Sequence, residues 1–330
     1  MNNFSTKLTN WYHNHKRDLP WRNTRDPFKI WLSEIILQQT RVDQGLSYYH
    51  KFIDRFSSVK DLAKASEDEV LSLWQGLGYY SRGRNLRKAA IQVMEEFNGV
   101  FPKDSINLKK LKGIGDYSSA AISSFSNDEK IAVVDGNVYR VLSRIFNIST
   151  PIDTGQGKKE FNTLANALIS SIDPASHNQA IMEFGATVCT PKKPLCNNCI
   201  FSDQCEAFND NLVYSLPVKS KKIKKSTRHF HFEFIFKENK VLLQKRDEKG
   251  IWANMFQLPL TETTSDQSPF SEKTELNWHC KHVLSHQNLF CKFYISNDDS
   301  SREGIWIELN QVGKYAIPKV IDNFLSQYFQ

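Results

Sequence analysis

The spacing of apolar residues changes near residue 230, and this change divides the chain into two parts that fold differently. Up to about Ala186, apolar side chains recur every three or four residues, as in FKIWLSEIILQQTRV and DGNVYRVLSRIF. This spacing is typical of amphipathic helices. From Phe230 to Phe236 every second residue is phenylalanine, and strand spacing returns at 289–295 and 305–309, ahead of a predicted helix at 319–329. We therefore expect an α+β chain, all-α first and sheet-rich α/β afterwards.

The composition is that of an ordinary globular protein of about two domains. The 330 residues include 43 Lys and Arg against 36 Asp and Glu, a net charge of +7. No apolar run approaches the roughly 18 residues that a membrane span requires. The sequence MNNFSTKLTNWYHNHKRDLPW lacks the apolar core of a secretory signal. We expect an intracellular, reducing location, with weak preference for a bacterial cytoplasm.

A basic segment lies between the two parts. Residues 217–229, PVKSKKIKKSTRH, contain six Lys and Arg and no acidic residue. Such a connector can follow a phosphate backbone. It can equally be a linker that lysine keeps solvated, and the sequence leaves both interpretations open.

Four of the six cysteines lie within one short stretch, which predicts a metal centre: Cys189, Cys196, Cys199 and Cys205. Zinc sites usually combine two CxxC-like pairs, and only Cys196 and Cys199 form one. Iron-sulfur clusters also accept four cysteines at uneven spacing, so an iron-sulfur cluster, zinc and unrelated thiols all remain open. The predicted role is structural. Cys280 and Cys291 stand apart and are expected to be buried, reduced thiols, with a redox role as the alternative.

A glycine-containing turn between helices suggests DNA binding. In LKGIGDYSSAAI, Gly113 and Gly115 follow a predicted helix end with three lysines at 108–112 and precede a helix start at 118–121. Glycines let backbone amides approach an anion closely, and a helix N-terminus adds positive potential. The pattern is that of a helix-hairpin-helix element at about 108–122 that binds the DNA backbone. An ordinary helix–helix turn would also carry glycine.

Two acidic residues lie beside apolar segments. Glu34 falls within IWLSEIIL, where burial would raise the pKa of its carboxyl group and make it a proton donor near neutral pH. A solvated position on an amphipathic helix is the structural alternative. Asp135 follows Ile131–Val134 and is expected to cap a helix that begins near Asn137. A carboxylate fixed there could also face a cationic transition state.

The ordered combination of these motifs resembles a known family. LPWR, SEIILQQTRV, GLGYYSRGRNL and VVDGNVYRVLSR occur in this order before the four-cysteine loop and the basic linker. They are similar to the endonuclease III superfamily of DNA glycosylases and, within it, to the adenine DNA glycosylase (MutY) family. The resemblance covers essentially the whole chain. It implies a helical glycosylase domain at 1–216, the linker at 217–229 and a Nudix-like domain at 230–330.

The resemblance also implies an activity and a set of site residues. The family removes adenine mispaired with 8-oxoguanine or guanine from duplex DNA, a base-excision repair reaction on an N-glycosidic bond. Glu34 then corresponds to the general acid and Asp135 to the catalytic aspartate that stabilises the oxocarbenium ion. Tyr117 stands where bifunctional relatives have a Schiff-base lysine, so a monofunctional enzyme is implied. Other implied positions are Asn137 in catalysis, Arg22 and Gln179 on adenine, and a 4Fe-4S cluster on Cys189, Cys196, Cys199 and Cys205.

Recognition of 8-oxoguanine is implied for residues in both parts: Gln39, Thr40, Leu77 and Tyr79 in the first and Ser285 and His286 in the second. The segment 242–260 resembles the opening of a Nudix fold, but no run of acidic residues follows it. Magnesium would lack ligands there, so nucleotide pyrophosphatase activity is not expected. Two positions depart from the family: Leu284 replaces an aromatic residue before Ser285, and Lys112 replaces a proline.

Other functions use the same features differently. A glycosylase on this scaffold could instead remove oxidised pyrimidines or mismatched thymine, but Glu34, Tyr117 and the C-terminal part speak against this. A second alternative is a non-catalytic damage sensor or iron-sulfur electron carrier, which would not need both Glu34 and Asp135. The implied partner is duplex DNA, bound by a monomer close to the nucleoid.

Overall fold

The fold is described from a computed structural model that covers residues 3–220, 225–270, 275–296 and 302–329. Two compact units are present, Met1–Ala63 with Lys88–Lys222, and Lys64–Arg87 with Ile223–Gln330. Each unit is described by itself. Part of the predicted basic linker, residues 221–224, lies outside the described residues.

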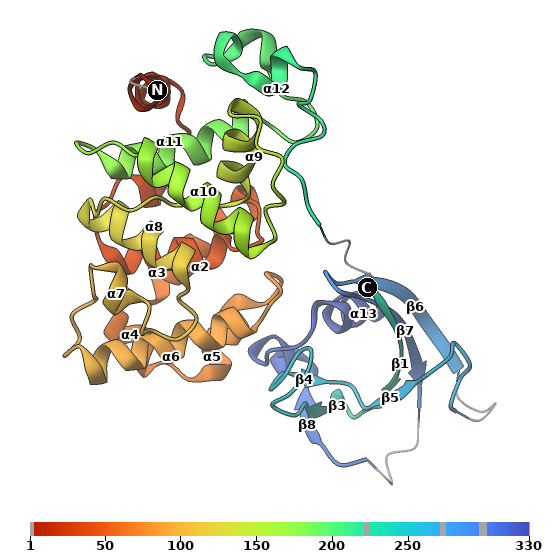
Figure 1. The fold of residues 1–330 in the computed structure, drawn as a ribbon. Helices are drawn as coiled ribbons and strands as arrows, with labels where there is room; N and C mark the ends of the chain where they lie inside the picture. The colour runs from red at the N-terminus through yellow and green to blue at the C-terminus, as the bar shows by residue number, and fades with distance from the viewer. Residues whose placement is uncertain (1–2, 221–224, 271–274, 297–301, 330) are drawn as a thin grey trace. The chain divides into compact units, whose positions relative to one another are not determined.

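Residues 3–220 are helical and contain no strand, as the apolar spacing predicts (Figure 1). The α-helices are α1 (Phe4–His15), α2 (Pro27–Leu37), α3 (Val42–Arg55), α4 (Val59–Lys64), α5 (Glu67–Trp74), α6 (Ser81–Glu96), α7 (Ser105–Leu108), α8 (Asp116–Asn127), α9 (Gly136–Ile145), α10 (Gly155–Leu168), α11 (Pro174–Thr187) and α12 (Glu206–Asn209). Short 3-10 turns lie at η1 (Pro20–Arg22), η2 (Cys196–Asn198) and η3 (Ser202–Gln204).

Side-chain caps fix the starts of helices α2, α9 and α11. Asp26, at the start of α2, accepts from the Phe28 amide, with Pro27 at the first helical position. Asp173 caps α11 in the same way, again before a proline. Asp135 caps α9, as expected. The first residues of these helices are therefore held in fixed positions.

Helix α11 is central to the first unit, since it packs against α1, α8 and α9, while α2 packs against α8 and α3. A buried cluster joins α1, α9, α10 and α11, with Leu8, Val141, Phe161 and Phe184 fully or almost fully buried. Gly185 allows α11 to approach α9 closely, because a Cβ atom there would lie 2.7 Å from the Asn137 Cβ. This contact brings α11 up to the start of α9.

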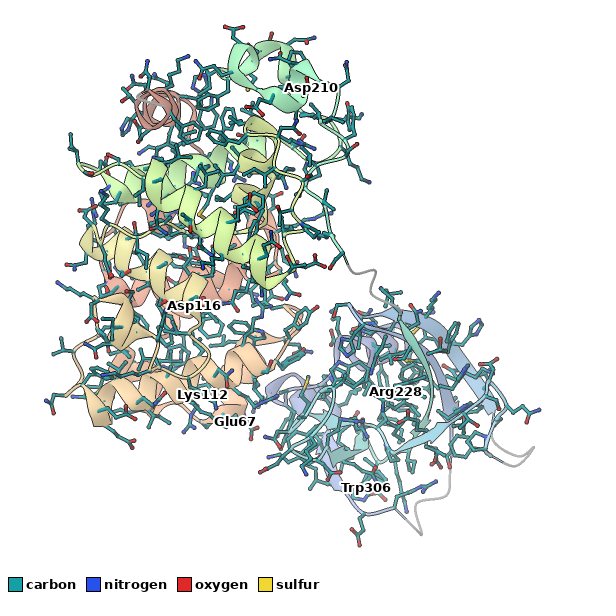
Figure 2. All side chains as sticks on the ribbon, in the orientation of Figure 1. Glu67, Lys112, Asp116, Asp210, Arg228 and Trp306 are labelled. Carbon is teal, nitrogen blue, oxygen red and sulfur yellow. The ribbon has the colours of Figure 1, made fainter. Side chains whose placement is uncertain are left out.

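The turn between α7 and α8 differs slightly from the predicted hairpin. Helix α7 ends at Leu108, so the three lysines follow the helix rather than forming its end. Helix α8 begins at Asp116, two residues before the predicted start at Ser118. Gly113 has a φ of +82°, a left-handed conformation that favours glycine. Lys112 and Asp116, labelled in Figure 2, flank the rest of this turn.

The second unit contains two small sheets. One has the order β5-β1-β7-β6, formed by β1 (Ser226–Phe234), β5 (Leu260–Thr263), β6 (Glu275–Val283) and β7 (Gln287–Ile295). The β1–β7 pair is parallel, and the other pairs are antiparallel. The second sheet joins β2 (Phe236–Lys237), β3 (Lys240–Lys245), β4 (Phe256–Gln257) and β8 (Ile305–Glu308), followed by η4 (Leu309–Lys314). Figure 2 labels Arg228 on β1 and Trp306 on β8.

Helix α13 (Lys319–Tyr328) is the closing helix that the sequence predicts at 319–329. It covers one face of the first sheet (Figure 1). The Phe324 ring stacks on Phe293 at a centroid distance of 4.4 Å. The alternating pattern of β1 does not leave one face in water, since His231 and Glu233 are buried as well. His231 contacts Tyr294 and Thr263, and Glu233 pairs with Arg302. The buried polar side chains of His231 and Glu233 are thus both paired.

Across the described ranges, none of the helices combines the length and apolar character that a bilayer crossing needs.

Candidate active site

A cavity of about 500 Å³ lies within the first unit, lined by η1, α2 and the turn after it, α8, the start of α9, and α11. Eight residues predicted for the site line it: Arg22, Glu34, Gln39, Thr40, Tyr117, Asp135, Asn137 and Gln179. These positions are distributed over 158 residues of sequence, so the helix packing, rather than local sequence, brings them together.

Glu34 lies on α2 with only 7% of its surface exposed. Burial raises the pKa of its carboxyl group from 4.5 to about 7, because the charged form loses its hydration. The negative charge of Asp135 acts in the same direction, whereas a hydrogen bond from the Tyr117 hydroxyl to Oε2, 3.0 Å long, acts against it. At neutral pH the group can therefore both hold and release a proton.

Asp135 is a half-buried carboxylate held at the N-terminus of α9. Its Oδ1 accepts from the amides of Asn137 and Val138, each at 2.8 Å, and its Oδ2 accepts from Asn137 Nδ2 at 2.7 Å. Burial raises the pKa of Asp135, and these hydrogen bonds oppose the rise. Its side chain is therefore rigid, and the donors around it favour the ionised form.

The pKa of the Tyr117 phenol is influenced by both acidic residues, Glu34 and Asp135. Burial raises the pKa of its phenol well above 10, and the charges of Glu34 and Asp135 raise it further. The phenol therefore keeps its proton and donates it in the bond to Glu34.

Asn137 is supported by an arginine that the sequence analysis did not identify. Arg140 Nη2 donates to Asn137 Oδ1 at 2.9 Å and to the Gly185 carbonyl oxygen at 2.6 Å. The guanidinium thus joins the start of α9 to α11 at the close contact that Gly185 permits. A motif that reads VVDGNVYR contains this arginine, but only the fold shows which carbonyl group it reaches.

Glu183 is a second functional position that sequence reasoning missed. Its side chain is 1% exposed, and it pairs with Arg17 Nε at 2.8 Å and Arg22 Nη2 at 2.6 Å. Burial alone would raise the pKa of Glu183, but hydrogen bonds from Arg17 and Arg22 lower it to about 2. The carboxylate therefore stays ionised and holds Arg22 against the cavity. A single acidic residue within the apolar segment NQAIMEFGATVC was the only sequence signal.

Gln179 and the turn after α2 complete the cavity wall. Gln179 Oε1 accepts from the Tyr12 hydroxyl at 2.5 Å, which directs the amide nitrogen away from Tyr12. Gln39 is exposed and has a φ of +57°, and Thr40 follows it. The neighbouring Gln38 donates to Ser118 Oγ at 3.0 Å. The turn is thereby attached to α8.

The other positions predicted to recognise 8-oxoguanine belong to the second unit. Leu77 is buried, whereas Tyr79 is 42% exposed and has a φ of +48°. Ser285 and His286 form the exposed turn between β6 and β7, with Ser285 Oγ and His286 Nδ1 3.1 Å apart.

The four clustered cysteines line one small, apolar cavity beside Phe184 and Val213. Among the described residues, no group of three or more His, Cys, Asp or Glu side chains is arranged to hold a metal ion. Arg144 contacts two of the cysteines. Its Nη1 donates to Cys189 Sγ, and its backbone carbonyl oxygen accepts from Cys205 Sγ, each at 3.4 Å. Burial is the largest cause that raises the pKa of Cys199 to about 11, and the charges of the other three cysteines act in the same direction.

Two family profiles match the chain. Residues 32–167 match the HhH-GPD superfamily base excision DNA repair protein profile, and residues 232–327 match the NUDIX domain profile. The first match begins within α2 and contains α8 and α9, and the second covers most of both sheets. They agree with the predicted helical glycosylase and Nudix-like domains.

Two solved structures resemble the helical part. The structure of a thermostable thymine-DNA glycosylase is 28% identical, with a TM-score of 0.59 over 63% of this chain and 96% of that chain. A non-covalent endonuclease III–DNA complex gives a TM-score of 0.56 at 18% identity, over 64% of this chain and 96% of that chain, and supports the fold alone.

Curated relatives extend the similarity over the full length. The adenine DNA glycosylase of Buchnera aphidicola subsp. Schizaphis graminum is 33% identical over 98% of this chain and 98% of its own length. The adenine DNA glycosylase of Mus musculus is 42% identical to this chain. The aligned region covers 62% of this chain and 42% of the mouse protein. The chain thus belongs to the adenine DNA glycosylase family.

Proposed function

We propose that the chain hydrolyses the N-glycosidic bond of adenine mispaired with 8-oxoguanine, or with guanine, in duplex DNA. The observation that carries this proposal is the position of Glu34. A buried carboxyl group with a pKa of about 7 and a hydrogen bond from Tyr117 lies in the same cavity as a fixed aspartate. Two carboxyl groups in different environments are the arrangement that acid-assisted glycosidic cleavage requires.

The reaction begins when adenine leaves the base stack and enters the cavity, since the bond is inaccessible within the duplex. Glu34 gives its proton to the purine ring, which makes the base a better leaving group. The glycosidic bond breaks with both electrons going to the base, and positive charge develops on the sugar. Asp135 stabilises this charge, and water then adds to the sugar and loses a proton, which restores the acid form of Glu34 and leaves an abasic site.

Four side chains are proposed to orient the reacting groups. Tyr117 and Asn137 hold Glu34 and Asp135 through the hydrogen bonds described above. Arg22 and Gln179 would bind the extruded adenine. Because Tyr117 has no amine to form an imine with the sugar, the proposed enzyme removes the base without cleaving the strand.

Recognition of the opposite base is proposed for residues of both units. Gln39 and Thr40, with Leu77 and Tyr79, would surround 8-oxoguanine. Ser285 and His286 would contact it from the exposed turn of the Nudix-like domain. Exchange of both turn residues for alanine is expected to reduce the preference for adenine opposite 8-oxoguanine over adenine opposite guanine.

We also propose that Cys189, Cys196, Cys199 and Cys205 hold a 4Fe-4S cluster. All four line one cavity. An iron-sulfur cluster accepts four cysteine thiolates at uneven sequence spacing. Bound there, the cluster would fix the loop that follows α11.

Duplex DNA is the proposed partner, contacted by the turn that carries Gly113 and Gly115. A Cβ atom at Gly115 would meet no protein atom within 4 Å, so internal packing does not require glycine there. Close approach of a phosphate group would require it. The organisation into residues 1–216, 217–229 and 230–330, a monomeric state and a cytoplasmic, nucleoid-associated location complete the proposal.

The test compares the wild-type chain with Glu34→Gln under single-turnover conditions, on duplexes that hold adenine opposite 8-oxoguanine or guanine, and thymine opposite guanine. We expect the variant to bind the duplex but to release adenine at least about 100-fold more slowly. Full adenine release by Glu34→Gln would refute the general-acid role. Preferential release of thymine by the wild-type chain would favour a different glycosylase.

A further inference from the structure

Two cysteines outside the four-cysteine loop face each other in the second unit. Cys280 on β6 and Cys291 on β7 are register partners in the antiparallel hairpin. Directly opposite residues in such a pair project from the same face of the sheet. The two thiols are therefore neighbours, although ten residues separate them in sequence.

The hydrogen-bond pattern defines the geometry of this pair. The Leu284 amide donates to the Gln287 carbonyl oxygen at 2.8 Å, so these opposite residues form a hydrogen-bonded pair. Such pairs recur at every second residue, and the register is regular from Trp278 to Val283. Cys280 and Cys291 are consequently also a hydrogen-bonded pair, with Cα atoms about 5.5 Å apart. A disulfide bond accepts Cα separations of about 4.4–6.8 Å.

The two thiols have different environments. Cys291 is 1% exposed and lies beside its other register partner, Phe230, in the core. Cys280 is half-buried on β6, the outer strand of this sheet. A hydrogen bond between the thiols lowers the pKa of Cys280 and raises that of Cys291. Cys280 is thus the more accessible thiol and the one that ionises first.

We propose that Cys280 and Cys291 form a reversible redox site whose oxidant is a small-molecule dialkyl disulfide. The Cys280 thiolate attacks one sulfur atom of the oxidant, which breaks the S–S bond and releases one small thiolate. Cys291 then loses its proton and attacks Cys280 Sγ, which forms the protein disulfide and releases the second small thiolate. Two protein thiols are oxidised, the oxidant is reduced, and the two protons pass to the small thiols.

The strand geometry makes this bond easy to reduce again. Opposite Cβ atoms in a hydrogen-bonded pair lie about 5.5 Å apart, whereas a disulfide requires about 3.8 Å. Formation of the disulfide therefore draws the two strands together, and the resulting strain favours reduction of the bond. The pair lies a few residues from the Ser285–His286 turn, but the redox site does not depend on the function proposed for that turn.

The test uses the full chain in buffers with increasing ratios of oxidised to reduced glutathione. Free thiols are then alkylated in denaturant, and tryptic peptides are mapped without reduction. Cleavage at lysine yields TELNWHCK with Cys280 and HVLSHQNLFCK with Cys291 as separate peptides. We expect them to become linked as the ratio rises and to separate again after the ratio is lowered.

The matched variant Cys280→Ser should lose the linked peptide and leave Cys291 alkylated. Three results on the wild-type chain would each overturn the proposal. These are separate alkylation of both cysteines at every ratio, a glutathione adduct on Cys280 that never resolves, and linkage of Cys280 to a different cysteine. The wild-type result decides the question even if a variant folds poorly, and it is read independently of glycosylase activity.

Discussion

Burial of Glu34 imposes a pH-dependent cost on the stability of the first unit. The pKa of this group is about 7 in the folded chain against 4.5 for an exposed glutamate. Between these values the folded state binds more protons than the unfolded state, so the free energy of unfolding falls as pH rises. The difference of about 2.5 pH units corresponds to a loss of about 3 kcal/mol above pH 7 and to none below about pH 4.5.

Glu34→Gln removes this titration while it keeps the shape of the side chain. We expect the variant to be more stable than the wild-type chain at pH 8, by up to about 3 kcal/mol, with the difference shrinking towards pH 5. Urea unfolding of both proteins at several pH values, followed by circular dichroism at helix wavelengths, measures the difference. Glu95→Gln, at an exposed position on α6, is the matched control. A difference that does not change with pH would refute the burial argument.

Other substitutions test single contacts. Tyr117→Phe removes a hydrogen bond that lowers the pKa of Glu34, so the decline of adenine release at high pH should move up by about one pH unit, visible in a single-turnover pH profile. Gly185→Ala places a methyl group 2.7 Å from the Asn137 Cβ and should lower the unfolding free energy by about 1–3 kcal/mol in urea titrations. Glu183→Gln leaves two arginines without their buried partner, and its expected loss of about 3 kcal/mol or more is measured in the same way.

Local sequence predicted those features that depend on local chemistry. The apolar spacing predicted helices up to about residue 186 and strands from residue 230, and both are present. Asp135 before glycine and asparagine predicted a helix cap. The apolar neighbours of Glu34 predicted burial and a raised pKa, as found. In each case the relevant neighbours lie within one helical turn.

Features that depend on distant contacts were not predictable from the pattern. Glu183 and Arg17 are 166 residues apart, and nothing in either segment indicates that they pair. The alternation in β1 places His231 and Glu233 on the face opposite the phenylalanines, yet both are buried, and residues from other segments pair with them. The Cys280–Cys291 pair likewise depends on strand register, which two isolated cysteines do not reveal.

Base release from a duplex that holds adenine opposite 8-oxoguanine tests the central claim most directly. The wild-type chain is incubated in excess over the duplex, so that each enzyme molecule turns over at most once. Half of each sample is then treated with hot alkali to cleave abasic sites. We predict release of free adenine and strand cleavage only after alkali. Intact adenine despite tight duplex binding would contradict the enzymatic account, and strand cleavage without alkali would contradict the monofunctional mechanism.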